Sequence, residues 1–226
     1  MKPVWGAMDP QNFAVARRNM VDCQIKPNRV AEPRLLAALG AVPREAFVPR
    51  NLRGVAYLDE PLSLGKGRSL LTPMVLARLL QAAEIQPTDV VLHVGCGTGY
   101  GAAIASRLAA TVVGLESDAA LAEVAAETLA AQGCDSVVIE RSALNQGCSK
   151  HAPYDVIVVE GQIDFLPEAL LDQLAEGGRL VAVLREHGVG EGSLWVKRQG
   201  RVGRRALFDA TVPTLPGFER VPGFVF

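Results

Sequence analysis

The sequence lacks the features that mark several classes of protein. Aromatic residues make up only 5% of the chain, and the formal net charge is −1. A general nucleic-acid binder concentrates positive charge, so we expect no nucleic-acid partner. The four cysteines form no CxxC pair, and no histidine stands near them at ligand spacing. This pattern predicts neither a disulfide scaffold nor a metal site.

Long hydrophobic runs are also missing. No stretch approaches the roughly 18–20 apolar residues that cross a bilayer. The first residues, Met1 to Trp5, lack the apolar core of a signal peptide. We therefore expect no membrane partner and a cytoplasmic location, where scattered cysteines stay reduced. With 226 residues, 49% of them hydrophobic, the chain is long enough for one well-buried domain.

From residue 88 onward, apolar runs typical of buried strands alternate with helical segments. The expected strands cover 89–94, 111–116, 136–140, 154–160 and 179–184, with helices over 100–109, 118–132 and 167–175. Continuous apolar strands alternating with helices indicate a parallel sheet covered on both faces. The tail then alternates polar and apolar residues over 193–198 and 205–208. We predict an α/β fold with a doubly wound, mostly parallel seven-stranded sheet and an antiparallel C-terminal hairpin.

A glycine-rich loop, Gly95-Cys96-Gly97-Thr98-Gly99, directly follows the first of these strands. Glycines allow the backbone to approach a ligand closely, and the start of the next helix offers free N–H groups. Glu116 stands about 20 residues further on, at the end of the second strand, where an acidic residue suits a pair of ribose hydroxyls. The strand, loop, helix, strand and acid in this order predict a site for a nucleoside-containing cofactor.

Two such cofactors compete for this loop. The dinucleotide spacing GxGxxG fails from Gly95, because Tyr100 takes the sixth position, and from Gly97 it starts two residues late. The GxGxG spacing from Gly95 is similar to the first motif of class I methyltransferases and favours S-adenosylmethionine. A tight turn that binds no ligand remains an alternative.

Further blocks extend the likeness to one family. Met20–Ile25, Val42–Pro49, the loop Gly65–Pro73 and the first cofactor motif from Asp89 to Tyr100 resemble protein-L-isoaspartate O-methyltransferases. The likeness runs from about residue 11 to 185. It implies a Rossmann-like class I methyltransferase with a SAM-binding core over 88–226. Residues 1–87 then form an N-terminal helical segment and substrate loop, a lid within the same domain.

The resemblance implies a repair reaction, the transfer of a methyl group from S-adenosylmethionine to the carboxylate of isoaspartyl residues in damaged proteins. Isoaspartyl proteins or peptides are then the partners of a monomer or weak homodimer. A carboxylate is already a nucleophile, so the main demand on side chains is to orient it. Ser69, Thr72 and Arg68 are the candidates. Alternatively, Ser69 and Thr72 cap the following helix, and Arg68 is a solvated loop charge.

The predicted cofactor-binding residues follow the ends of the strands and are His93, Gly95, Cys96, Gly97, Thr98, Gly99, Tyr100, Glu116, Ser117, Ser142, Ala143 and Glu160. Three of them have alternative interpretations: His93 as a buried histidine with its hydrogen bonds made inside the protein, Cys96 as a small residue that fills space, and Glu160 as the partner of a nearby arginine.

The chain also departs from the family pattern at the predicted site. Leu71 replaces the serine of the family's substrate loop, Arg68 its glutamine and His93 the acidic residue that starts the cofactor motif, while a family aspartate is lost near Ser142. These departures leave two alternatives open. One is a methyltransferase with a different substrate, and the other is a catalytically silent relative that acts as a binding module.

Overall fold

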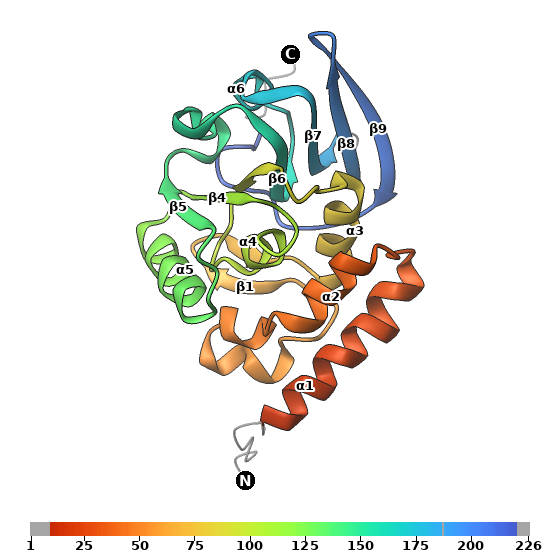
Figure 1. Cartoon of the computed structure of the whole chain (residues 1–226), viewed down its shortest axis with the longest axis vertical. Helices are drawn as coiled ribbons and strands as arrows, with labels where there is room; N and C mark the ends of the chain where they lie inside the picture. Colours follow the sequence, from red (N-terminus) through yellow and green to blue (C-terminus); the bar gives the residue numbers. More distant parts are fainter. Residues whose placement is uncertain (1–9, 187, 221–226) are drawn as a thin grey trace, which may run out of the picture.

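The structure is a computed structural model that describes residues 10–186 and 188–220, and a seven-stranded sheet forms its centre (Figure 1). The strand order is β5-β4-β3-β6-β7-β8-β9. The strands are β3 (Val90–Val94), β4 (Thr111–Glu116), β5 (Val137–Arg141), β6 (Tyr154–Ile163), β7 (Leu174–Arg185), β8 (Gly190–Arg198) and β9 (Arg201–Asp209). The strands from β3 to β7 pair in parallel, and β8 and β9 add an antiparallel meander. The predicted fold class is confirmed.

Helices precede and connect the parallel strands, with α3 leading into the first of them. They are α3 (Pro73–Ala83), α4 (Tyr100–Ala105), α5 (Ala119–Ala131) and α6 (Glu168–Asp172), with 3-10 turns over Leu144–Gln146 and Ser149–His151. The carboxylate of Asp118 caps α5 by accepting from two backbone N–H groups in the first turn. The predicted helices over 100–109 and 167–175 both run too far, because α4 ends at Ala105 and α6 ends at Asp172. The Gln173 carbonyl accepts from the Tyr154 N–H, so the chain leaves the helix to join β6.

The N-terminal segment consists mainly of helical elements. It consists of α1 (Pro10–Asn19), a π-helix (Met20–Ile25), a 3-10 turn (Lys26–Asn28), α2 (Pro33–Ala41) and two more 3-10 turns (Arg44–Phe47 and Arg50–Val55). Pro33 lies in the first turn of α2, where its missing N–H costs nothing. The predicted loop over 64–73 instead begins as a hairpin of β1 (Leu62–Gly65) and β2 (Arg68–Leu70). This hairpin is a sheet of its own, separate from the central one.

Two hydrophobic clusters lie on opposite faces of the central sheet. One packs the N-terminal helices, α3, α4 and α5 against inward residues such as Val91 and Val158. The other packs α6 and the C-terminal residues Leu215 and Phe218 against Leu92 and Val159. Successive strand residues point to opposite faces, which explains the continuous apolar runs. No helix within the described ranges is long and apolar enough to cross a membrane.

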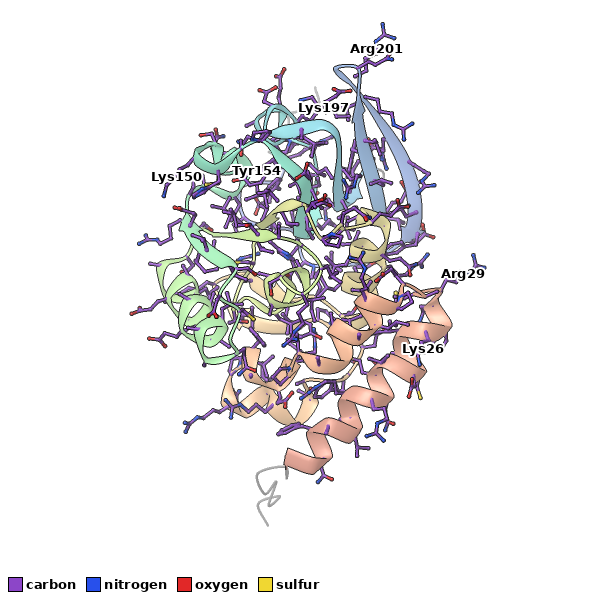
Figure 2. All side chains as sticks on the ribbon, in the orientation of Figure 1. Lys26, Arg29, Lys150, Tyr154, Lys197 and Arg201 are labelled. Carbon is purple, nitrogen blue, oxygen red and sulfur yellow. The ribbon has the colours of Figure 1, made fainter. Side chains whose placement is uncertain are left out.

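The two edges of the sheet differ in their cover. Figure 1 shows α5 beside β5 at one edge and the β8–β9 hairpin at the other. The outer strand β9 carries Arg201, Arg204 and Arg205, all of them exposed. Figure 2 shows Arg201 extending outward from the tip of that hairpin.

Candidate cofactor and active site

The sheet reverses its winding direction between β3 and β6. From β3 the chain builds outward through β4 to β5, whereas β6 and β7 lie on the other side of β3. In open α/β sheets the ligand crevice lies at this switch point, outside the carboxyl ends of the strands. The loop Gly95–Gly99 occupies that position, and Gly95, Gly97 and Gly99 have φ of 74°, 55° and 96°. These angles favour glycine, which explains the spacing found in the sequence.

Glu116 lies at the end of β4 with a fully buried carboxylate. It accepts hydrogen bonds from three backbone N–H groups, those of Gly97 (2.9 Å), Ser117 (2.8 Å) and Asp118 (3.2 Å). The glycine loop and the start of the next connection therefore both fix this side chain. It stands where the sequence predicted an acidic residue for ribose hydroxyls.

Arg68 enters the same place from β2. Its side chain is 3% exposed, and Nη2 lies 3.1 Å from Oε2 of Glu116. The same nitrogen donates to the Gly95 carbonyl at 2.6 Å. The guanidinium thus contacts both the acidic residue and the glycine loop. It is neither a solvated loop charge nor free to pair with a substrate carboxylate in this arrangement.

Two leucines complete the cover over the loop. A Cβ atom added to Gly97 would lie 2.8 Å from Leu64, and one added to Gly95 would lie 2.7 Å from Arg68 and 3.1 Å from Leu215. Leu64 belongs to β1, whereas Leu215 comes from the C-terminal segment. The chain's own side chains therefore fill the concave side of the glycine loop.

His93 and Glu160 form a second buried pair beneath the loop. His93 Nε2 lies 2.7 Å from Oε2 of Glu160, across the neighbouring strands β3 and β6. Gly101 of α4 packs directly against both side chains. Glu160 thus meets a histidine rather than an arginine, and both residues lie within the core below the predicted cofactor position.

Sequence reasoning missed Arg44, which is fully buried. Its Nε donates to the Ala56 carbonyl at 2.7 Å, its Nη2 donates to the Leu71 carbonyl at 2.5 Å, and its guanidinium lies 4.8 Å from the Tyr100 ring centroid. Burial lowers the pKa of Arg44 and raises the pKa of Tyr100. Arg44 belongs to the family block Val42–Pro49. Its position among apolar residues was the only sign in the sequence that this arginine is buried. Arg44 fixes the chain at Leu71, directly after the hairpin.

The remaining predicted residues have local contacts. Thr72 caps α3 by accepting from the Val75 N–H, and the Thr98 hydroxyl donates to the Phe47 carbonyl at 2.5 Å. Ser69 is half-buried in β2, where it pairs with Ser63. Three other predicted residues differ in their environment. Cys96 is buried, whereas Ser142 and Ala143 are exposed after β5.

The side chains around the glycine loop can be compared with those that S-adenosylmethionine would need. The glycine loop and Glu116 are the types of group that would hold its nucleoside. However, Arg68 already takes the Glu116 carboxylate and the space against Gly95, and Leu215 lies beside it. A cavity of about 560 Å³ is lined instead by residues of α3, β7, β8 and β9. In the described conformation Arg68 and Leu215 therefore lie against the face of the glycine loop where the cofactor is predicted to bind, and Arg68 contacts the carboxylate that would meet its ribose.

Comparison with known proteins identifies the family. Residues 16–207 match the family described as protein-L-isoaspartate(D-aspartate) O-methyltransferase. A protein-L-isoaspartate O-methyltransferase of Synechococcus sp. is 43% identical over 180 residues, which are 80% of this chain and 73% of that protein. One from Methanoculleus marisnigri is 40% identical over 186 residues, which are 82% and 84% of the two chains.

Solved structures agree in fold. A protein-L-isoaspartate O-methyltransferase superposes with a TM-score of 0.78 at 25% identity, covering 89% of this chain and 66% of that one. A Plasmodium falciparum protein of that putative activity, in complex with S-adenosyl-L-homocysteine, gives a TM-score of 0.76 at 21% identity over 90% and 97%. The match to the family model spans both the N-terminal segment and the sheet. This chain belongs to the protein-L-isoaspartate O-methyltransferase family.

Proposed function

We propose that this chain transfers a methyl group from S-adenosylmethionine to the α-carboxylate of isoaspartyl residues in damaged proteins. The supporting observation is the family match over residues 16–207, together with a buried Glu116 held beside the glycine loop. Three backbone N–H groups hold the Glu116 carboxylate. These hydrogen bonds do not involve Arg68, so we expect the carboxylate to keep its position if the Arg68 side chain moves away. A conformation in which the β1–β2 hairpin has moved Arg68 away from Glu116 would therefore still offer the predicted cofactor site.

Methyl transfer to a carboxylate needs no strong general acid or general base. The cofactor supplies an electrophilic methyl group, and the substrate carboxylate is already a nucleophile. The chain's own residues must then orient that carboxylate and keep water away from it. Ser69 is the best-placed hydroxyl, since it lies on the hairpin beside Arg68 and donates to no carbonyl among residues 10–186 and 188–220, whereas Thr72 caps α3.

The test is methyl transfer to a synthetic peptide that contains one isoaspartyl residue, with the same peptide containing aspartate as the control. We expect labelled methyl groups on the isoaspartyl peptide alone. Ser69→Ala should lower kcat/KM by about tenfold or more, because the substrate carboxylate loses an orienting hydrogen bond. Methylation of neither peptide by a protein that binds adenosylhomocysteine would contradict the proposed substrate.

A second candidate is a silent relative that acts as a binding module. The closed site favours it, since Arg68 and Leu215 stand where a cofactor would lie. Absence of adenosylhomocysteine binding at millimolar concentration, by the wild type and by variants at Arg68 alike, would favour this candidate over the enzyme.

The proposal also extends to the setting of the reaction. Isoaspartyl proteins or peptides are the proposed partners, without nucleic acid, and the proposed location is cytoplasmic. We propose a monomer or weak homodimer, which sedimentation velocity at micromolar concentrations measures directly.

A further inference from the structure

We propose that Arg68 is an intramolecular competitor for the cofactor. Its ion pair with Glu116 closes the nucleoside site, and a ligand must displace the guanidinium before it binds. This inference rests on the proposed function, because it concerns the same site. It goes beyond that function by assigning to one residue the control of access.

The contacts of Arg68 coincide with those expected of a nucleoside. Nη2 lies 3.1 Å from Glu116 Oε2, and Nε lies 3.3 Å from the same oxygen. Nη2 also donates to the Gly95 carbonyl at 2.6 Å. Hydroxyls of a ribose would compete for the same carboxylate. A guanidinium and a nucleoside therefore cannot occupy this position together.

Glu116 does not need Arg68 to remain satisfied. Its two oxygens accept from the N–H groups of Gly97, Ser117 and Asp118. Removing one partner of a buried ion pair is costly when the other charge is left without hydrogen bonds. Here the carboxylate retains three donors, and a displaced Arg68 regains water. The pair can therefore open at a lower cost than an isolated buried ion pair.

The element that carries Arg68 shares no strand pairing with the central sheet, and it is held to the core through Leu62 and Leu70. The β1–β2 hairpin is a separate two-stranded sheet, and such hairpins are marginal in stability on their own. Its turn, Gly65 to Gly67, has positive φ at all three residues. The central sheet loses no strand pairing if the hairpin swings away.

One movement would uncover two contacts of the glycine loop. Arg68 lies against Gly95, and Leu64, on the other strand of the hairpin, lies against Gly97. Leu215 belongs instead to the C-terminal segment, where its N–H donates to the Gln162 carbonyl at 2.9 Å. We therefore assign the gate to the hairpin and treat Leu215 as part of the fixed wall.

The test is calorimetric titration with S-adenosylhomocysteine. When only a fraction of the molecules is open, the apparent Kd equals the intrinsic Kd divided by that open fraction. A variant that cannot form the ion pair should therefore bind more tightly. We expect Arg68→Gln to lower Kd by on the order of tenfold. Arg68→Lys keeps the charge but loses the two-pronged contact, and it should give an intermediate value. Lys66→Gln, an exposed cation on the same hairpin, is the matched control and should stay within about twofold of the wild type.

A second measurement does not depend on binding. Hydrogen exchange of the backbone amides over 62–70 should be faster in Arg68→Gln than in the wild type without ligand, because the hairpin has lost its anchor. The inference is overturned if Arg68→Gln binds no more tightly than the wild type, or if neither protein binds. Methylation is measured separately. Tighter binding without methylation supports the gate and contradicts the enzyme, whereas methylation with equal affinities contradicts the gate alone.

Discussion

His93 and Glu160 connect two neighbouring parallel strands through a buried contact, with Nε2 of the imidazole 2.7 Å from a carboxylate oxygen. Both side chains lie within the core beneath the glycine loop, with exposures of 0% and 2%. Gly101 of α4 packs on the pair, so the position of the helix depends on it. The relationship explains how a histidine can take a place that is acidic in the family pattern.

Gly101→Ala should destabilise the protein. A Cβ at this position would lie 2.6 Å from His93 Nε2 and would also press on Glu160. Overpacking of a close-packed core costs about 1–3 kcal/mol, which urea denaturation measures as a lower midpoint. Gly40→Ala is the control, since nothing lies within 4 Å of its Cβ. It lies in α2 and should be neutral or slightly stabilising. Equal effects of the two substitutions would rule out the packing argument.

The His93–Glu160 pair should show strong coupling in a double-mutant cycle. His93→Leu leaves a buried carboxylate without its partner, which costs about 3–5 kcal/mol. Glu160→Met removes the other half, and the double variant should be more stable than the sum of the single effects predicts. Free energies of unfolding of the four proteins give the coupling. Additive effects would mean that the contact contributes nothing specific.

Asp164 should make stability depend on acid pH. Its hydrogen-bonded ion pair with Arg185 holds the pKa of Asp164 below the ordinary 3.8. The unfolded chain therefore takes up this proton first as the pH falls, so the stabilisation is present above about pH 3.8 and is lost below it. Asp164→Asn should be destabilised at pH 6, with a smaller difference from the wild type at pH 3. Asp209→Asn, at an exposed carboxylate of β9, should show no such convergence.

Thiol reactivity should separate the cysteines. Cys23 is exposed, whereas Cys96 is buried and burial raises its pKa, with Glu116 adding to the effect. The thiolate is the reactive form, so Cys96 should resist an aromatic disulfide reagent at pH 8 until the protein unfolds. One fast thiol that disappears in Cys23→Ser is the expected result. A fast thiol that persists in that variant would contradict the buried placement of the others.

The fold could be predicted because the parallel strands are apolar runs that alternate with helical segments. The glycine loop and Glu116 follow from the same regularity, since strand ends gather at one edge of a sheet. The contact of Arg68 with Glu116 could not be predicted, because it joins residues 48 positions apart through a hairpin that looks like a loop. With only three or four residues, its strands are too short to show alternation.

The cover of the site escaped prediction for a related reason. Leu215 belongs to no motif, and it reaches the glycine loop only because the C-terminal segment pairs with Gln162. The resemblance ended near residue 185, before this segment. The site is thus assembled from three distant parts of the chain, and only the hairpin and the central part lie within the family resemblance.

The arginines of β9 have a consequence for how the protein behaves in a crowded solution. An outermost strand presents unpaired N–H and C=O groups that invite strands of other molecules. Arg201 and Arg205 line this border as exposed cations, whereas Arg204 pairs with Glu186 and Glu191, so a second copy approaching the border would bring the first two charges against their counterparts. The repulsion disfavours growth of the sheet from molecule to molecule, and with it the first step toward fibrous aggregates.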